Sequence, residues 1–202
     1  KDLTDRNRIR EIITESATQK FTAWDLGISD STSIWVAETI GGEVRIMDYY
    51  ENHGKSLDTY IAYLDENGYR DYTHILPHDV NVRELQTGKS RYEFLTDAGL
   101  NIEVCPKHSV EDGIQSVRRM LTNVWFNKET TKYGVECLRN YRRQFNEKLN
   151  VYLEKPKHDF ASHGADAFRY LAMGIDTSGS GKRSNWSEPY ESTFDGSSYK
   201  SQ

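Results

Sequence analysis

The alternation of apolar and polar residues changes its period part-way along the chain, and this change limits the folds that the chain can adopt. Strand patterns come first, over 20–26, 32–40 and 43–50. Gly41-Gly42 between the last two is a signal for a two-residue hairpin, so these strands are expected to form an antiparallel meander. Strand and helix patterns alternate afterwards. We therefore expect an α/β fold in which a mixed sheet, the meander plus parallel strands, is flanked by helices.

The second part of the chain is expected to alternate between helices and short strands. A helix from 55 ends at Asn67-Gly68, a helix stop signal, and is followed by a strand over 73–76. Ser109 and Asp112 resemble a capping arrangement that opens another helix. The other expected elements are a helix over 90–98, a strand over 101–105, a helix over about 131–147, an extended segment over 151–154 and a last helix over about 162–174.

The chain divides into one globular part and two polar ends. Its 202 residues are enough for one domain with a hydrophobic core, and the apolar runs assign that domain to 18–176. Residues 1–17 are charged and weakly amphipathic, and are expected to form a short helix that joins something upstream. Residues 177–202 are rich in Ser and Gly and are expected to be flexible, because they cannot bury enough apolar surface.

Composition excludes several classes of protein. A net charge of −5 argues against a protein that binds DNA tightly by itself, but not against a catalytic module delivered to nucleic acid by another protein. Cys105 and Cys137 lack metal-ligand spacing and are too few for a disulfide scaffold, so we expect buried thiols in a reducing compartment. No apolar run approaches the ~20 residues of a membrane span, and no signal-peptide pattern opens the chain. A soluble, intracellular protein is expected.

Two aspartates are expected at the ends of buried strands, where a charge is unusual. Asp25 ends the first apolar run close to Gly27, a residue that lets a backbone or a ligand approach closely. Asp79 follows the strand over 73–76 and is expected at the carboxyl edge of the sheet, where ligands bind in open α/β folds. For each of them a turn-forming role remains an open alternative.

A third aspartate, Asp166, is expected within the last helix. The apolar residues Ala165 and Phe168 turn its side of the helix toward the sheet, and His163 lies three residues earlier on the same face. A carboxylate in this place needs a partner, because burying it alone is costly. The alternative to a functional role is a buried ion pair with Arg169.

Brought together, three carboxylates repel one another unless a cation lies between them. Oxygen ligands suit Mg²⁺ or Mn²⁺ better than Zn²⁺. Two such ions, about 3.5–4 Å apart, can activate water and stabilise the leaving oxygen in phosphodiester cleavage. Asp25, Asp79 and Asp166 are therefore the predicted catalytic and metal-binding residues.

Three further side chains are auxiliary candidates for this site. Asp30 follows Asp25 by five residues and is expected to fold back toward it. His163 is a candidate to assist a metal-bound water, with a structural role as the alternative. Asp159 precedes the last helix, and its alternative role is to cap that helix.

The order of elements, with acids on the first strand, after the fourth strand and on the last helix, resembles the ribonuclease H-like fold. More narrowly, the chain is similar to the C-terminal nuclease domain of the large terminase subunit of tailed bacteriophages. The similarity is carried by five motifs in order: WDLG at 24–27, PHD at 77–79, GIQSVRRML at 113–121, LRNYR at 138–142 and HGADAFRY at 163–170. Together they span nearly the whole globular part, and the last is the most specific.

The resemblance implies that Asp25, Asp79 and Asp166 bind two Mg²⁺ or Mn²⁺ ions. It implies an endonuclease that cuts concatemeric viral DNA during genome packaging, in the host cytoplasm at the procapsid. The implied partners are double-stranded DNA, an upstream ATPase domain of the same protein, the portal and the small terminase subunit, with no membrane. The sequence has no Gly-x-x-x-x-Gly-Lys-Ser/Thr motif, so the chain itself is not the motor, and residues 1–17 are then the linker from that ATPase domain.

Contacts with DNA and two other functions remain open. The basic residues Arg83, Lys89 and Arg91 follow Asp79 and are the candidates for phosphate contacts, with a solvated surface as the alternative. One other function is a different ribonuclease H-like nuclease, of the junction resolvase or integrase type. The second is a non-catalytic module that docks on the portal, in which the acids are structural.

Overall fold

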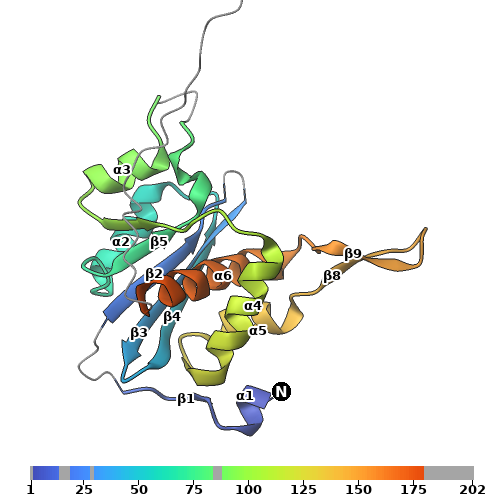
Figure 1. Cartoon of the computed structure of the whole chain (residues 1–202). Helices are drawn as coiled ribbons and strands as arrows, with labels where there is room; N and C mark the ends of the chain where they lie inside the picture. Colours follow the sequence, from blue (N-terminus) through green and yellow to red (C-terminus); the bar gives the residue numbers. More distant parts are fainter. Residues whose placement is uncertain (1, 14–18, 28–29, 84–87, 180–202) are drawn as a thin grey trace, which may run out of the picture.

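The structure is a computed structural model that describes residues 2–13, 19–27, 30–83 and 88–179. Within these residues, seven strands form one mixed sheet and two more form a separate hairpin (Figure 1). The strands are β1 (Ile9–Arg10), β2 (Gln19–Asp25), β3 (Ser31–Ile40), β4 (Glu43–His53), β5 (Thr73–Leu76), β6 (Asn101–Val104), β7 (Val124–Asn127), β8 (Arg143–Asn146) and β9 (Val151–Pro156). The helices are α1 (Asp2–Asp5), α2 (Leu57–Glu66), α3 (Arg91–Asp97), α4 (Val110–Met120), α5 (Lys132–Asn140) and α6 (Phe160–Gly179), with 3₁₀ helices η1 (His78–Asn81) and η2 (Leu121–Asn123).

The antiparallel meander predicted from the strand patterns is confirmed as β2, β3 and β4. The turn between β3 and β4 is made by Gly41 and Gly42, with φ angles of 56° and 84°. Both values lie in the left-handed region that a type I′ hairpin turn requires and that glycine adopts at little cost. The strand that carries Asp25 is therefore fixed at the start of a rigid three-stranded unit.

Parallel strands extend the meander on both sides, in the order β1-β7-β4-β3-β2-β5-β6. This confirms the predicted mixed sheet. On one side β5 runs parallel to β2, with Phe21 beside Thr73 and Ala23 beside Ile75. Because parallel strands end at the same edge, the end of β2 at Asp25 and the start of η1 after β5 lie next to each other at the carboxyl edge of the sheet.

Hydrophobic clusters cover both faces of the sheet. On one face, Trp35 and Phe168 belong to a cluster that joins the sheet to α4, α5 and α6. On the other face, Trp24 and Tyr60 belong to a cluster that includes α2 and α3. Figure 1 shows α4, α5 and α6 gathered on one side of the strands. None of the helices in the described ranges, α6 included, is both long and apolar enough to cross a membrane.

Helix α6 packs closely against the sheet at Gly164. The buried Trp35 indole donates a hydrogen bond from Nε1 to the Gly164 carbonyl oxygen, at 2.7 Å. A Cβ atom at Gly164 would lie 2.6 Å from the Tyr49 hydroxyl oxygen and 3.0 Å from Cys137 Cβ. Only glycine therefore lets the helix rest at this depth, and the contact sets the height of the neighbouring residues of α6 above the sheet.

Both cysteines are buried, as the sequence predicted. Cys105 follows β6 and Cys137 lies in α5, and both are free thiols. Burial raises the pKa of the Cys105 thiol to about 12 and that of Cys137 to about 11. Neither is therefore a reactive thiolate at neutral pH.

The segment after α5 differs from the expected long helix over 131–147. The helix ends at Asn140, because Tyr141 adopts an extended backbone and its hydroxyl binds Asp166. Residues 143–146 form β8, which pairs with β9 in an antiparallel hairpin. Pairing within this hairpin thus overrides the helical pattern here. The expected extended segment over 151–154 is confirmed as part of β9.

The ends of the domain also differ from the sequence expectation. A helix over 1–17 is wrong for the described residues: α1 covers only Asp2–Asp5, and Ile9–Arg10 form β1 beside β7. The four-residue strand β7 was missed, because it is too short to show a period of its own. Helix α6 continues to Gly179, so the start of the expected flexible tail over 177–202 is helical, and residues 180–202 lie outside the described residues.

Replacing Gly164 by alanine is expected to lower the free energy of unfolding by about 1–2 kcal/mol. Overpacking of a close contact costs typically 1–3 kcal/mol, against a gain of roughly 1 kcal/mol in helix propensity. Urea unfolding of Gly164→Ala measures this, with Ala62→Ser on the exposed surface of α2 as the control. A Gly164→Ala protein as stable as the control would contradict the close packing.

Candidate active site

The three predicted aspartates lie on three different elements. Asp25 is the last residue of β2, Asp79 lies in η1 directly after β5, and Asp166 lies in the first half of α6. The Asp25 side chain is 20% exposed and that of Asp166 is 31% exposed, whereas Asp79 faces solvent. The elements that carry them converge because β5 runs beside β2 and α6 packs across both strands.

The charges of these acids affect the pKa values of the same neighbouring groups. Burial raises the pKa of the Asp25 carboxyl; the hydrogen bond with His163 opposes this, and the negative charge of Asp166 adds to it. Burial also raises the pKa of the Tyr170 phenol to about 12. The positive charge of Arg169 opposes this effect, and the charges of Asp25, Asp166 and Asp79 add to it. The three carboxylates therefore lie in one electrostatic neighbourhood around Tyr170.

The three carboxylates are more widely spaced than the ligands of one bound ion. Among the described residues, the one group of ligand atoms that all lie within 4.8 Å of one another is formed by Asp30, His158 and His163. Repulsion between carboxylates favours such a wider spacing when no cation lies between them. The predicted acids therefore lie in one region of the molecule, but their oxygens do not form one group of ligand atoms within 4.8 Å of one another.

Asp166 forms the ion pair with Arg169 that the sequence analysis gave as the alternative to a functional role. Arg169 donates from Nη2 to Asp166 Oδ1 at 3.0 Å, and the Tyr141 hydroxyl donates to the same oxygen at 3.3 Å. The Arg169 side chain is only 8% exposed and passes over Gly113, where a Cβ atom would lie 2.3 Å from Arg169 Cγ. One side of the Asp166 carboxylate is therefore held in place by two donors.

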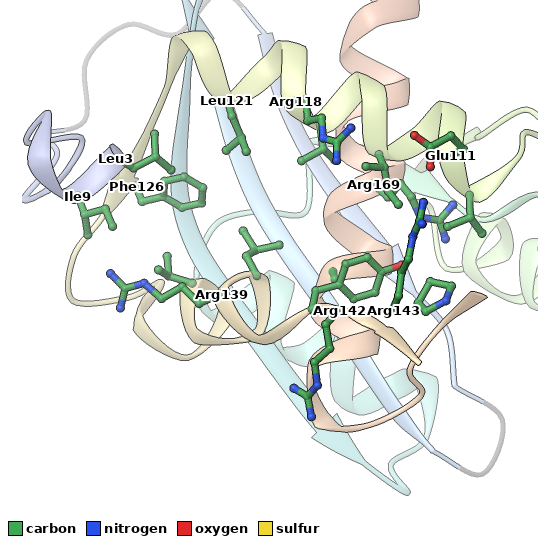
Figure 2. Close-up of a pocket in the computed structure, with 18 of the residues that line it drawn as sticks. Leu3, Ile9, Glu111, Arg118, Leu121, Phe126, Arg139, Arg142, Arg143 and Arg169 are labelled. Carbon is green, nitrogen blue, oxygen red and sulfur yellow. The ribbon is translucent and has the colours of Figure 1, made fainter. Parts of the chain in front are cut away.

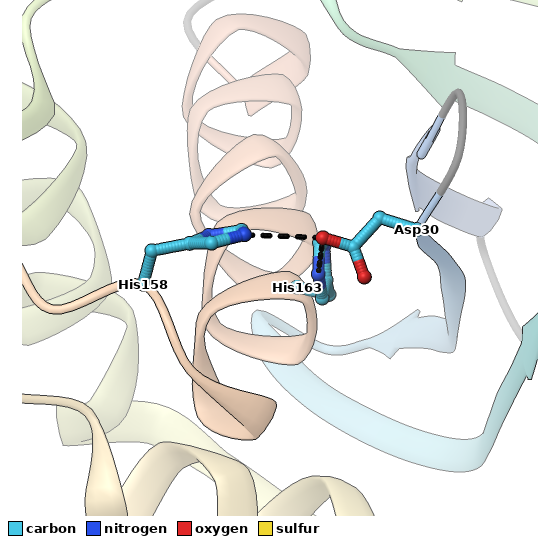
Figure 3. A group of neighbouring side chains, drawn as sticks. All are labelled: Asp30, His158 and His163. Carbon is cyan, nitrogen blue, oxygen red and sulfur yellow. Dashed lines mark hydrogen bonds and ion pairs between the residues drawn. The ribbon is translucent and has the colours of Figure 1, made fainter.

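The imidazole of His163 lies between Asp30 and Asp25. Figure 3 shows its contact with Asp30. His163 Nδ1 lies 3.0 Å from Asp25 Oδ2, and its Nε2 lies 3.0 Å from Asp30 Oδ2. Gly27 permits the chain to fold back here, since a Cβ atom there would lie 2.5 Å from the Ser31 carbonyl oxygen. The hydrogen bond to Asp25 is the main cause that raises the pKa of His163 to about 9.

His158 was missed by the sequence reasoning, although it lies in the same group. Its Nε2 is 3.0 Å from Asp30 Oδ2, the oxygen that also meets His163 (Figure 3). The sequence signal available was a second histidine five residues before His163, just outside the helix. The distance to Asp30 depends on the loop after β2, which no local pattern encodes.

Asp159 performs the capping role that was its alternative. Its Oδ1 accepts a hydrogen bond from the Ala161 backbone N–H at 3.1 Å, in the first turn of α6. Its other oxygen lies 3.4 Å from Arg142 and 3.6 Å from Lys157. This carboxylate is therefore occupied at the start of the helix, outside the group of Asp30 and the two histidines.

The predicted phosphate-binding residues lie on both sides of a segment, 84–87, that is outside the described residues. Arg83 pairs with Glu93 at 3.4 Å and Lys89 with Asp97 at 3.0 Å. Arg91 donates from Nη1 to the Leu26 carbonyl oxygen at 3.0 Å, next to Asp25.

A cavity of about 490 Å³ adjoins this end of β2. Its lining includes Leu26 and Gly27 on one side and three cationic side chains, those of Lys55, Lys89 and Arg91. Lysine and arginine are the usual partners of nucleic-acid phosphates. The positive lining therefore begins beside the strand end that carries Asp25.

A second cavity, of about 910 Å³, lies between α4, α5 and the start of β8 (Figure 2). Leu121 and Phe126 form part of its apolar wall, and Arg118, Arg139 and Arg142 line its polar part. Tyr141 and Arg169, the partners of Asp166, also line it, so this cavity reaches the back of the acidic region.

Comparison with known proteins gives matches only at the level of three-dimensional structure. No family model and no curated protein matches the chain. The large terminase of a thermophilic bacteriophage superposes with a TM-score of 0.65 at 17% identity, over 86% of this chain and 44% of that one. The P22 large terminase nuclease domain gives a TM-score of 0.61 at 18% identity, over 84% and 89%.

The nuclease domain of the large terminase of bacteriophage SPP1, solved with bound manganese, gives a TM-score of 0.57 at 19% identity, over 83% of this chain and 95% of that one. The chain thus spans less than half of the thermophilic phage terminase but most of the isolated nuclease domains. The predicted ribonuclease H-like arrangement is confirmed, and the chain has the fold of large terminase nuclease domains.

Proposed function

We propose that this chain is a metal-dependent DNA endonuclease of the large terminase type, which cuts viral DNA during genome packaging. The observation that supports the proposal is that Asp25 ends β2, Asp79 follows the neighbouring parallel strand β5, and Asp166 lies on α6, which packs across both strands. The shared fold supports it, as does the manganese bound to the related SPP1 domain. The nuclease domain then includes β1, which pairs with β7 in its sheet, and all of α6, and it follows an ATPase domain in the longer protein.

The donor set at this edge fits magnesium or manganese. Asp25, Asp79 and Asp166 offer only carboxylate oxygens, which these hard cations prefer. When bound, two such ions supply an activated water and stabilise the leaving oxygen in phosphodiester hydrolysis. Burial is the main cause of the raised pKa of Asp25 and the charge of Asp166 adds to it, and a bound cation would offset both effects.

The surrounding side chains position these carboxylates. His163 holds Oδ2 of Asp25, which leaves Oδ1 without this constraint. Tyr141 and Arg169 both bind Oδ1 of Asp166, which turns Oδ2 away from them. Arg169 also supplies a positive charge that offsets part of the repulsion between the acids.

DNA is proposed to lie along the cavity that Lys55, Lys89 and Arg91 line, beside Asp25. The net charge of −5 means that this local positive surface, rather than the chain as a whole, attracts phosphates. A net negative chain is suited to receive DNA from another domain, and we propose that the ATPase domain delivers it. The portal and the small terminase subunit are the further proposed partners, in the host cytoplasm.

Replacement of each acid is expected to lower plasmid cleavage at least about 100-fold. Asp25→Asn, Asp79→Asn and Asp166→Asn each remove a charged ligand, a loss of transition-state stabilisation of about 2.7 kcal/mol or more. The measurement is nicking and linearisation of supercoiled plasmid in Mn²⁺ or Mg²⁺, with and without a chelator. Asp71→Asn, at an exposed acid away from the site, is the control.

Two outcomes would overturn this assignment. A wild-type protein that stays inert with both metals would favour the portal-docking module, and full activity of the three variants would place the chemistry elsewhere. A four-way junction is cleaved alongside linear duplex, and a strong preference for the junction would point to a resolvase-type nuclease.

Charge reversal in the basic cavity is expected to weaken DNA binding several-fold. Lys55→Glu and Lys89→Glu each remove a phosphate contact, which lowers the slope of log affinity against log salt by about 1. Fluorescence anisotropy of a labelled duplex, in chelator and over a range of salt, measures this. Lys132→Glu, at an exposed position of α5, is the control, and identical binding by all three variants would refute the proposed DNA path.

A further inference from the structure

The cavity of about 910 Å³ between α4, α5 and the start of β8 has apolar walls (Figure 2). These walls come from separate segments of the chain: Leu3 in α1, Val117 in α4 and Leu138 in α5. All three side chains pack against the core cluster but are only partly buried by it. Binding sites are typically apolar cavities of roughly 300–1,000 Å³. The cavity is therefore large enough to take apolar side chains of a bound segment.

The same cavity carries an excess of positive charge. Its lining includes five arginines and two glutamates: Arg118, Arg139, Arg142, Arg143 and Arg169, with Glu111 and Glu154. All of the arginines except Arg169 are exposed. Figure 2 shows Arg118 and Arg139 on opposite sides of the apolar walls. In a chain with a net charge of −5, this surface is therefore suited to an apolar segment that carries acids.

The chain itself contains a segment of this chemistry near its C-terminus. Residues 186–195 read WSEPYESTFD and lie outside the described residues. Aromatic residues recur at every fourth position, and an acid follows each of them within two residues: Trp186 and Glu188, Tyr190 and Glu191, Phe194 and Asp195. The segment contains no lysine or arginine. Its composition thus complements both parts of the cavity, the apolar walls and the arginines.

We propose that residues 186–195 bind in this cavity of their own chain, with the aromatic side chains against the apolar walls and the carboxylates at the exposed arginines. Arginine stacks on aromatic rings and also pairs with carboxylates, so it suits both kinds of side chain in the segment. Aromatic anchors in an apolar pocket with charged groups around them are typical of protein recognition sites. The proposal goes beyond the nuclease function and does not depend on it.

The length of the chain allows this segment to reach the cavity. Helix α6 lies beside α4, where the Ser116 hydroxyl meets Met173 Sδ at 3.1 Å, and Val117 next to Ser116 lines the cavity. The last residue of α6, Gly179, follows Met173 by six residues, which is about 9 Å along a helix. Residues 180–185 can span up to about 20 Å when extended. Trp186 is therefore within reach of the cavity.

A segment bound here would lie behind the proposed active site, on the side away from the proposed DNA path. Tyr141 and Arg169 line the cavity, and both donate to Asp166 Oδ1. The cavity that Lys55 and Lys89 line has no lining residue in common with this one. Binding of the segment is therefore expected to leave the proposed DNA path open.

Photo-crosslinking in the full chain tests the proposal. p-Benzoylphenylalanine replaces Tyr190, and mass spectrometry locates the crosslinked residues after irradiation at low protein concentration. The expected result is crosslinks within one chain to α4, α5 or the start of β8. Arg118→Glu combined with Arg143→Glu is expected to lower their yield several-fold, because two attractions become repulsions. Both arginines are exposed, so these changes leave the fold intact, which circular dichroism verifies.

Two further sets of variants serve as controls. Lys132→Glu changes an exposed charge of α5 outside the cavity and is expected to keep the wild-type yield. Glu188→Lys combined with Glu191→Lys is expected to lower the yield in the native chain. The same pair of changes is expected to restore the yield in the arginine double variant, because opposite charges then face each other again.

Several results would overturn the proposal. Crosslinks that are absent, or that lie elsewhere in the chain, would show that the segment does not bind in the cavity. Crosslinks found only between two chains would assign the cavity to a second copy of the protein. If the arginine double variant crosslinks like the wild type but loses binding of a labelled DNA duplex, the arginines belong to a nucleic-acid surface instead. Because the main readout is position, loss of nuclease activity leaves this result unaffected.

Discussion

The contact between α6 and the sheet at Gly164 sets the position of the two residues that α6 contributes to the proposed site, His163 and Asp166. The hydrogen bond from the Trp35 indole to the Gly164 carbonyl lies in the buried interior, where a lost partner is costly. On one side of Gly164 the helix carries His163, which meets Asp25. Two residues beyond it the helix carries Asp166, held by Arg169. A helix resting higher on the sheet would separate His163 from Asp25, and Asp166 from Tyr141.

Charge balance explains how so many acids coexist in a small volume. The Asp166 carboxylate is paired with Arg169, and the imidazole of His163 lies between Asp25 and Asp30. Asp25 and Asp166 thus each have a partner on one oxygen, Oδ2 of Asp25 and Oδ1 of Asp166. The same arrangement suits the proposed magnesium or manganese ions at the aspartates, because carboxylate oxygens are hard donors.

The sequence was sufficient where local pattern decides the outcome. Asp25 was placed by the end of an apolar strand, and Asp79 by the strand that ends before Pro77, because strand period and turn residues are local properties. The partners of Asp166 and Asp30 could not be predicted in the same way. Tyr141 reaches Asp166 only because α5 ends early, and His158 reaches Asp30 only because a loop folds back at Gly27. Such contacts join segments that lie far apart in the chain, and local sequence patterns do not show which of these segments meet.

The central claim is that Asp25, Asp79 and Asp166 together hold the ions that cleave DNA. A crystal structure of the chain soaked in Mn²⁺, with the ions located by anomalous scattering, tests this most directly. The account predicts anomalous peaks bridged by carboxylate oxygens of Asp25, Asp79 and Asp166, with the aspartates drawn closer together than in the present arrangement. Fully occupied manganese that contacts none of these three residues would contradict it.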